Sequence, residues 1–236
     1  MIATGGKQVY GAPIGILMLE AQFPRIPGDM GNAETWPFPV LYRVVRGASP
    51  DLVVRQGAEG MLTPFIDAAQ ELIRQGAEAI TTNCGFLALF QAELSAALKV
   101  PVMTSALMQV SMAQALLPPG RRVGVITISA ESLTKAHLEG AGCPADTPVI
   151  GTNPNGEFAR AILDNRLEMD VDAAREDLRN AARRMKQEHP EVGAVVLECT
   201  NMPPYQADVV DVLGLPVFSM VDYVCWLQSG LRPRVY

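Results

Sequence analysis

Short apolar runs alternate with stretches of helical periodicity along most of this chain. The first run, Ile14–Leu19, contains only apolar residues and one glycine, and it ends at the polar Glu20. Similar strand-like runs stand at 79–83, 100–103, 123–128, 148–151 and 194–197, separated by helix-length segments. Strands alternating with helices are typical of proteins with parallel sheets. The pattern therefore predicts an α/β protein.

Capping and breaking residues predict where the helices begin and end. Thr63 followed by Pro64 predicts a helix N-cap and first position, and Gly76 predicts the end of that helix. Further helices are expected at 86–98, 105–117, 132–139, 157–163 and 172–188, and a strand followed by a helix at 217–227. Segment 23–32 is rich in turn residues and is expected to be a long ordered loop. Long loops after a strand often carry function.

The chain contains what looks like one unit twice. A shift of 115 positions places Cys84 on Cys199, and a shift of 109 places Gly15 on Gly124. The first shift also superimposes Gln91 on Gln206, Ala92 on Ala207, Leu98 on Leu213, Pro101 on Pro216 and Val102 on Val217. We therefore expect two similar lobes, each a parallel-sheet α/β sandwich, related by pseudo-twofold symmetry with the active site in the cleft between them. Residues 1–106 and 219–236 are assigned to the first lobe, because the last helix is expected to cross back, and 107–218 to the second.

Composition narrows the classes of function. A formal net charge of −6, with no basic stripe, argues against nucleic acid or an anionic membrane as the partner. No signal peptide or membrane-spanning run is visible, so a cytoplasmic protein is expected. With only two histidines and no Cys-x-x-Cys pair, no zinc cluster is expected, and the four cysteines are expected to be free thiols. Neither a P-loop nor a G-x-G-x-x-G motif is present, which excludes the usual nucleotide sites.

Cys84 and Cys199 are the candidate reactive groups. Each stands at the end of an expected strand and before an expected helix, where ligands bind in open α/β sheets and where a helix N-terminus lowers a thiol pKa toward neutrality. Their polar neighbours suit a closed core poorly, and a bound substrate is one partner for them. Two thiols on opposite faces of one carbon suit a reaction that needs a proton acceptor and a proton donor. Cys143, Cys225 and both histidines are expected to be structural or solvated.

These residues resemble the aspartate/glutamate/hydantoin racemase superfamily. The stretch Cys199-Thr200-Asn201-Met202-Pro203 matches the family's Cys-Thr-x-x-Pro motif, and Asn83-Cys84 is similar to the context of its first thiol. The resemblance implies racemisation of an amino acid, aspartate or glutamate first, without pyridoxal phosphate, metal or other cofactor. One thiolate removes the proton next to the carboxylate, and the other thiol reprotonates the opposite face. Family members are often dimers, so the resemblance also implies a homodimer.

Residues beside the thiols and at the ends of the first strands are the candidates for binding a small carboxylate or amino acid. They are Asn83, Gly85, Phe86, Thr200, Asn201, Glu20, Arg25 and Ser129. Arg25 either grips a distal substrate carboxylate or forms an ion pair within its own loop.

The chain departs from the glutamate racemases in ways that leave its substrate open. Asn201 stands where a histidine is common, and Gly85 and Phe86 follow the first thiol in place of Asn-Thr. The superfamily also includes maleate isomerases, which use two cysteines, and arylmalonate decarboxylases, which retain one. Both reactions, and a catalytically silent carboxylate binder, remain alternatives.

Overall fold

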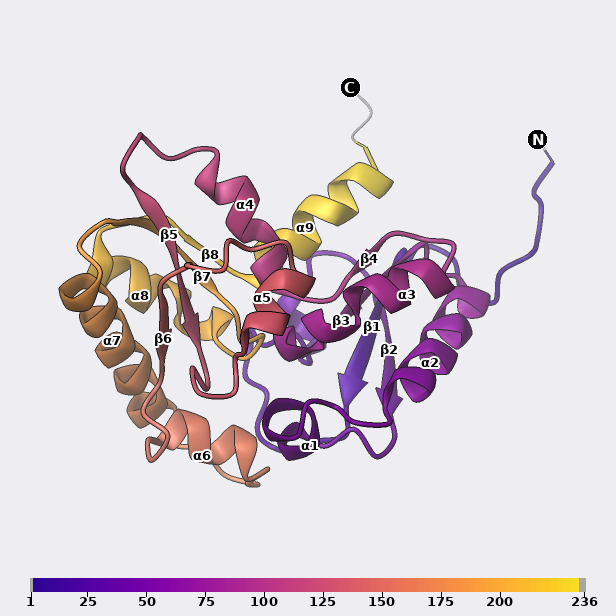
Figure 1. Cartoon of the computed structure of the whole chain (residues 1–236). Coiled ribbons are helices and arrows are strands. Elements are labelled where there is room, and N and C mark those ends of the chain that lie inside the picture. The colour runs from indigo at the N-terminus through magenta and orange to yellow at the C-terminus, as the bar shows by residue number, and fades with distance from the viewer. Residues whose placement is uncertain (1, 234–236) are drawn as a thin grey trace.

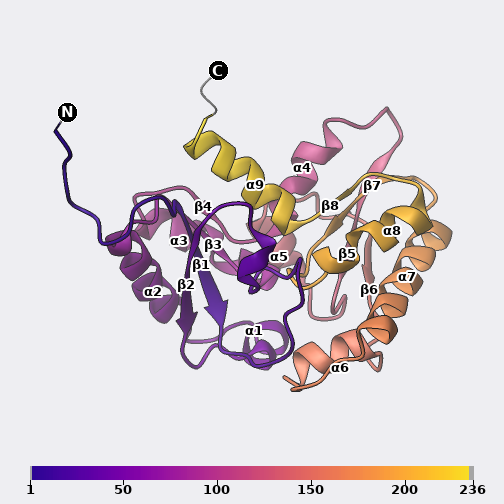
Figure 2. The ribbon, with the colours of Figure 1, turned by 180° about the vertical axis from the view of Figure 1, so that it is seen from behind.

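The computed structural model describes residues 2–233, and these residues form two four-stranded parallel sheets (Figures 1 and 2). The first sheet has the strand order β2-β1-β3-β4 and the second β6-β5-β7-β8. The strands are β1 (Ile14–Leu19), β2 (Val40–Val45), β3 (Ala79–Thr82), β4 (Val102–Met103), β5 (Arg122–Thr127), β6 (Val149–Gly151), β7 (Val192–Leu197) and β8 (Val217–Phe218). The predicted α/β class with two lobes is confirmed.

Helices cover both sheets and meet where the two lobes face each other. Figure 1 shows α2 and α3 on the first sheet and α7 and α8 on the second, with α1 and α6 close together at one end of the molecule. The α-helices are α1 (Pro50–Arg55), α2 (Leu62–Gln75), α3 (Gln91–Ala97), α4 (Gln109–Gln114), α5 (Lys135–Gly140), α6 (Glu157–Leu163), α7 (Val171–Glu188), α8 (Gln206–Leu213) and α9 (Met220–Leu231). Short 3₁₀ helices are η1 (Ala33–Thr35), η2 (Gly85–Phe90), η3 (Ala106–Met108) and η4 (Pro203–Tyr205). Within residues 2–233, no helix combines the length and apolar character needed to cross a bilayer.

The two sheets repeat the same register. In the sequence, shifts of 109 and 115 positions superimpose identical residues. The same two shifts relate the strand pairings of one sheet to those of the other. The equivalent pairs are Gly15 with Ile80 and Gly124 with Val195, then Ile80 with Val102 and Val195 with Val217. The repeat in the sequence is therefore a repeat of structure.

A glycine in each central strand allows a close approach of neighbouring side chains. A Cβ atom at Gly15 would lie 2.9 Å from Ile80 Cδ1 and 3.1 Å from Leu72 of α2. A Cβ at Gly124 would lie 2.8 Å from the sulfur of Met185 on α7. A side chain at either position would have to push these neighbouring side-chain ends aside, so glycine favours the close packing of the helix on its sheet.

Several predicted boundaries are wrong for identifiable reasons. The helix predicted at 86–98 is divided into η2 and α3, because Leu87 N–H donates to the Cys84 carbonyl three residues back, at 3.1 Å. Helix α2 begins at Leu62 rather than after Thr63, because the N–H of Phe65 already bonds the Met61 carbonyl at 3.1 Å. Strand β2 and helix α1 had not been predicted.

The end of the last helix contacts the first lobe, to which this helix was expected to cross back. Arg232, which follows α9, forms an ion pair of 2.7 Å with Glu78. The lobe limits drawn between 106 and 107 and between 218 and 219 stay predictions, and residues 1 and 234–236 lie outside the described part of the chain.

Candidate active site

A small pocket lies between the carboxyl ends of β3 and β7. Cys84, which follows β3, and Cys199, which follows β7, both line it. Each of the two cysteines is only 8% exposed. The flanking residues 83–86 and 199–201 complete this part of the lining, so the structure brings the two thiols and most of the predicted binding residues together.

Cys84 is the residue that precedes η2, and its thiol rests in the protonated form. Burial raises the pKa of Cys84 to about 12, and the charge of Glu198 adds to the increase. The backbone N–H groups of Phe86 and Leu87 act in the opposite direction without outweighing burial. The expectation that a helix start would bring the thiol pKa toward neutrality is therefore wrong, because η2 is a short 3₁₀ segment and the sulfur is buried.

Cys199 has the same electrostatic surroundings. Burial raises its pKa well above the ordinary value, and the charge of Glu198 is again the second cause. Its sulfur donates a hydrogen bond to the Asn201 side-chain oxygen at 3.5 Å. Cys84 also contributes to the raised pKa of Cys199, as expected for two thiols that share one pocket. A reaction that uses either thiol as a base must therefore change the local charge first.

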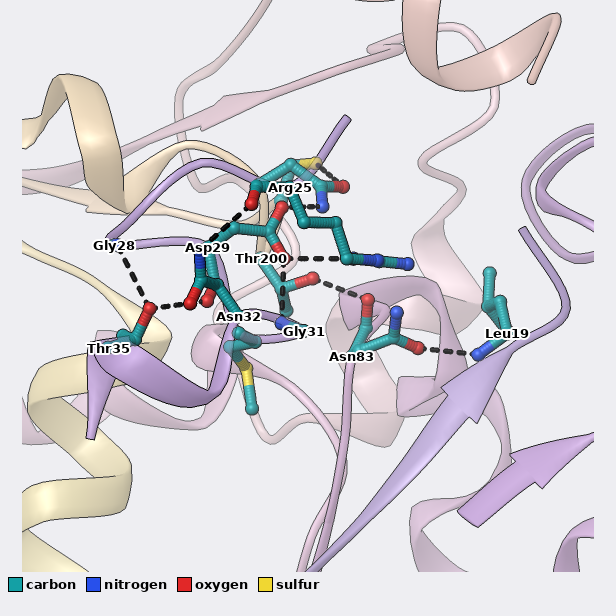
Figure 3. A network of polar contacts seen from close by, with 12 residues as sticks. Leu19, Arg25, Gly28, Asp29, Gly31, Asn32, Thr35, Asn83 and Thr200 are labelled. Atoms are coloured by element: carbon teal, nitrogen blue, oxygen red, sulfur yellow. Dashed lines mark hydrogen bonds and ion pairs between the residues drawn. The ribbon is translucent and has the colours of Figure 1, made fainter. Parts of the chain in front are cut away.

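Asn83 and Thr200 join the two lobes beside the thiols. The Thr200 hydroxyl donates to the Asn83 carbonyl, and the Asn83 side-chain oxygen accepts the Leu19 N–H at 2.7 Å (Figure 3). The polar groups that suggested a bound substrate in the sequence thus have partners within the protein. Their predicted role in substrate binding stays a prediction.

The loop after β1 contacts the pocket residue Asn201 through Asp29, a buried residue that the sequence had not singled out. Its carboxylate accepts hydrogen bonds from Arg25 Nη1 at 2.9 Å and from the Gly31 N–H at 2.7 Å (Figure 3). It also accepts a hydrogen bond from the Asn201 side chain. Arg25 therefore forms the ion pair within its own loop, and its guanidinium carbon lies 4.4 Å from the centre of the Phe23 ring. This ring in turn lines the pocket.

Three of the predicted binding residues are absent from the pocket lining. Arg25 is engaged as described. Glu20 accepts the Gly47 N–H at 2.7 Å, and Ser129 shares a hydrogen bond of 2.9 Å with Ser132. The repeat that aligns Glu20 with Ser129 correctly predicted equivalent strand ends, but it contained no information on where these side chains turn.

Glu198 is an ionisable pocket residue that the sequence interpretation missed. Its side chain is completely buried and lines the pocket with both thiols. One carboxyl oxygen, Oε2, accepts the Thr127 hydroxyl at 2.7 Å, whereas Oε1 has no hydrogen-bond partner. Burial raises the pKa of Glu198 to about 7. A signal was present, since Glu198 occupies the position equivalent to Asn83 and is an ionisable group at the end of an apolar strand.

The rest of the lining is apolar and comes partly from α1 and α6. Val54 of α1 and the pair Ile162 and Leu163 of α6 face the cavity from opposite lobes. Phe23 and Phe86 add aromatic rings. These contacts could not be predicted while α1 itself was unrecognised. Among the described residues, no three His, Cys, Asp or Glu side chains are grouped in a way that could hold a metal ion.

Cys143, Cys225 and His137 lie outside the lining of this pocket. The Cys143 sulfur is 3.1 Å from the Leu107 carbonyl oxygen, and burial raises its pKa to about 12. The His137 ring packs edge-on against Phe86, with 5.1 Å between ring centres. The contacts of Cys143 and His137 agree with the structural roles expected for these two residues.

Comparison with known proteins identifies relatives for most of the chain. A family model described as Asp/Glu/Hydantoin racemase matches residues 55–227. The dimethylsulfoniopropionate lyase of Durusdinium sp. clade D is 27% identical over 222 residues, which are 89% of this chain and 72% of that protein. Dimethylsulfoniopropionate lyase 6 of Emiliania huxleyi (strain CCMP1516) is 28% identical over 219 residues, which are 88% of this chain and 57% of that longer protein.

Solved structures share the two-lobe fold. An arylmalonate decarboxylase superposes with a TM-score of 0.63 at 19% identity, covering 94% of this chain and 93% of the decarboxylase. The aspartate racemase of Picrophilus torridus superposes with a TM-score of 0.58 at 12% identity, covering 93% of this chain and 94% of the racemase. At these identities the likeness concerns the fold alone.

Proposed function

This chain belongs to the aspartate/glutamate/hydantoin racemase family, and we propose that it is a thiol-dependent enzyme that removes the proton next to the carboxylate of a small substrate. The observation that carries the proposal is the placement of Cys84 and Cys199 in the lining of one pocket between the lobes. A carbon held there has a sulfur available as proton acceptor. Preorganised dipoles around a developing enediolate supply much of the stabilisation that such a weakly acidic proton requires.

The reaction that follows proton removal is β-elimination of a neutral sulfide from a sulfonium carboxylate. The relatives named dimethylsulfoniopropionate lyases support this choice, since they align with 88–89% of the chain. One thiolate takes the proton on the carbon next to the carboxylate. The electron pair of that C–H bond forms the carbon–carbon double bond, the C–S bond breaks, and its electrons leave on sulfur as dimethyl sulfide. Acrylate remains, and the proton stays on the thiol until it passes to water.

The character of the pocket suits this reaction. Dimethyl sulfide leaves as a neutral molecule, so its departure requires no acid beside it. The largely apolar walls contributed by Val54, Ile162 and Leu163 accommodate methyl groups. The second thiol then stabilises the enediolate intermediate by donating a hydrogen bond. It does not reprotonate the opposite face of the carbon, as it would in a racemisation.

Racemisation of an amino acid is the second candidate, and one observation favours it. Both thiols line the pocket, as a two-base mechanism requires, whereas an elimination needs one base only. The two reactions share their first step and differ in whether the substrate carries a leaving group on the next carbon.

One experiment in deuterated buffer tests the proposal and separates the two candidates. The purified protein is incubated with dimethylsulfoniopropionate and, separately, with D- and L-amino acids. Release of dimethyl sulfide with formation of acrylate supports elimination. Deuterium at the α-carbon of an amino acid with inversion supports racemisation. If neither substrate class reacts or exchanges, the proposal of proton removal next to a carboxylate is wrong.

Cysteine variants provide the controls. Cys84→Ser and Cys199→Ser are both expected to reduce turnover, and the variant that removes the base is expected to lose about 100-fold or more, in line with the contribution of a general base. Cys225→Ser changes a thiol on α9 outside the pocket lining and is expected to retain activity. Equal activity in all three variants would show that the paired thiols do not carry the reaction.

A further inference from the structure

The carboxyl group of Glu198 has an unusual environment for a buried acid. It lies between the lobes, fully buried, with Oε2 fixed by the Thr127 hydroxyl at 2.7 Å and Oε1 without a partner. A buried carboxylate is expensive unless it is paired or fully hydrogen-bonded. An unpartnered oxygen on a residue that lines a pocket is therefore a candidate for contact with a ligand.

The opposite lobe leaves room for this carboxyl group. A Cβ atom at Gly85 would come within 2.2 Å of Glu198 Oε1 and within 2.6 Å of the Glu198 carbonyl oxygen. The glycine next to the first thiol thus allows the carboxyl group of the second lobe to reach the pocket. Its position is set by both lobes, and it lies beside the site of proton transfer.

The described lining of the pocket contains no cationic side chain in contact with Glu198. Among the described residues that line it, none is Lys, Arg or His. The nearby Arg25 lies outside the lining, where its Nη1 is paired with Asp29 at 2.9 Å and its buried Nη2 has no partner. A ligand with two carboxylates would add a further negative charge to Glu198, whereas a zwitterion with one cationic centre would balance it.

We infer that Glu198 is the residue that binds the cationic centre of the substrate, and that this centre is a methylated onium group rather than a primary ammonium. The inference rests on the proposed function and assigns the residue that recognises the substrate. An ammonium needs about three acceptors, but this carboxyl group offers one free oxygen in a largely apolar lining. A methylated onium has no N–H to satisfy, and the rings of Phe23 and Phe86 provide aromatic surface for it.

This contact also couples binding to the formation of the base. The negative charge of Glu198 is the second cause, after burial, of the raised pKa of both pocket thiols. A cation against Oε1 offsets that charge and lowers the pKa of Cys84 and Cys199. The substrate therefore helps to generate the thiolate that deprotonates it, whereas in the free enzyme the thiols stay protonated and protected from oxidation.

Binding to the intact protein, measured by calorimetry, tests the inference independently of turnover. The ligands are trimethylammoniopropionate, its uncharged-headgroup isostere tert-butylpropionate, and β-alanine, which carries a primary ammonium. We expect the trimethylammonium ligand to bind at least about tenfold more tightly than either of the others. Equal affinity for the trimethylammonium ligand and its tert-butyl isostere overturns the role of Glu198. Tighter binding of β-alanine overturns the assignment of a methylated centre.

Glu198→Gln is expected to abolish the preference for the trimethylammonium ligand over its isostere. Glu131→Gln, which changes an exposed carboxylate on the loop after β5, is the matched control and is expected to keep the preference. A preference that survives in Glu198→Gln contradicts the inference. Should that variant not fold, the comparison of ligands on the wild-type protein still decides the question.

The proposed function and this inference fail in different ways. A wild-type protein that prefers the trimethylammonium ligand but releases no dimethyl sulfide contradicts the elimination and leaves the role of Glu198 standing. A protein that releases dimethyl sulfide without this preference, or whose Glu198→Gln variant retains it, contradicts the role of Glu198 alone.

Discussion

Gly85 is the residue at which the first lobe approaches the Glu198 carboxyl group. An added methyl group there would lie 2.2 Å from Oε1, and the carbonyl oxygen at 2.6 Å cannot move as a side chain could. We expect Gly85→Ala to lower the free energy of unfolding by about 1–3 kcal/mol, because the lobes must separate or the carboxyl group must turn away. Activity is expected to fall as well, because the displaced group lies beside both thiols.

Gly230→Ala is the matched control for Gly85→Ala. Gly230 lies in α9, and a Cβ atom there meets nothing within 4 Å. Alanine is expected to leave stability unchanged or to raise it by up to about 1 kcal/mol, since it favours the helix. Urea-induced unfolding and turnover measured on both variants check the prediction. Equal free energies of unfolding for the two variants would mean that the lobes accommodate a methyl group at Gly85 without loss of stability, and would contradict the prediction.

At the level of single residues, the sequence predicted the groups that the repeat marks. Cys84 and Cys199 could be paired because both halves of the chain retain the same residue at the same place. Glu198 and Asp29 could not be found in this way. Their importance depends on burial and on which neighbours satisfy them, and a single sequence does not contain that information.

At the level of the elements, one side chain at the junction between η2 and α3 links this helical segment to the end of strand β4. Gln91 donates to the Val102 carbonyl at 3.1 Å and accepts the Thr104 N–H at 3.0 Å. The equivalent Gln206 donates to the Val217 carbonyl at 2.9 Å, but there Asp222 accepts the Ser219 N–H instead. Both glutamines hold the last strand of their sheet, and the first does so with more bonds to the backbone.

We expect Gln91→Ala to lower the free energy of unfolding by about 1–3 kcal/mol, because it leaves the buried Thr104 N–H without a partner. Gln206→Ala is expected to cost less, because Asp222 still holds the second lobe's equivalent N–H. Chemical unfolding of the two variants under the same conditions measures the difference. A larger loss for Gln206→Ala would contradict this account of the two junctions.

The buried strands were predicted, whereas strand β2 and helix α1 were missed, for a physical reason. β1, β3, β5 and β7 are buried almost throughout, so that burial alone dictates apolar side chains. β2 at the edge is half-exposed and mixes polar and apolar residues, which hides it among loops. The short helix α1 is only six residues long and was missed together with the pocket wall that it provides.

At the scale of the whole molecule, the two lobes meet at an interface that contains the pocket. A hydrogen bond crosses it from the Thr200 hydroxyl to the Asn83 carbonyl. The repeat in the sequence predicted two similar lobes, but it could not predict which unlike residues meet between them. Stability and site chemistry are therefore coupled at the buried Glu198.

The last prediction concerns how global stability depends on pH through Glu198. Burial raises its folded-state pKa to about 7, from an ordinary value of 4.5. Between these two values the folded protein retains a proton that the unfolded chain has lost, so the contribution of this group to stability falls as pH rises. Glu198→Gln keeps a neutral side chain at every pH. Relative to wild type, the variant is therefore expected to become more stable from pH 4.5 to pH 7.

The stability difference between Glu198→Gln and wild type is expected to grow by about 3 kcal/mol across this window and to stay constant above it, because one pKa unit corresponds to about 1.4 kcal/mol. Urea unfolding at a series of pH values measures the difference directly. Glu131→Gln serves as the control for the change in net charge, since its carboxylate is exposed. A difference for Glu198→Gln that does not change with pH would mean that Glu198 is ionised at low cost. The unpartnered Oε1 would then have found a partner within the protein, and the carboxyl group would no longer be available to a cationic substrate.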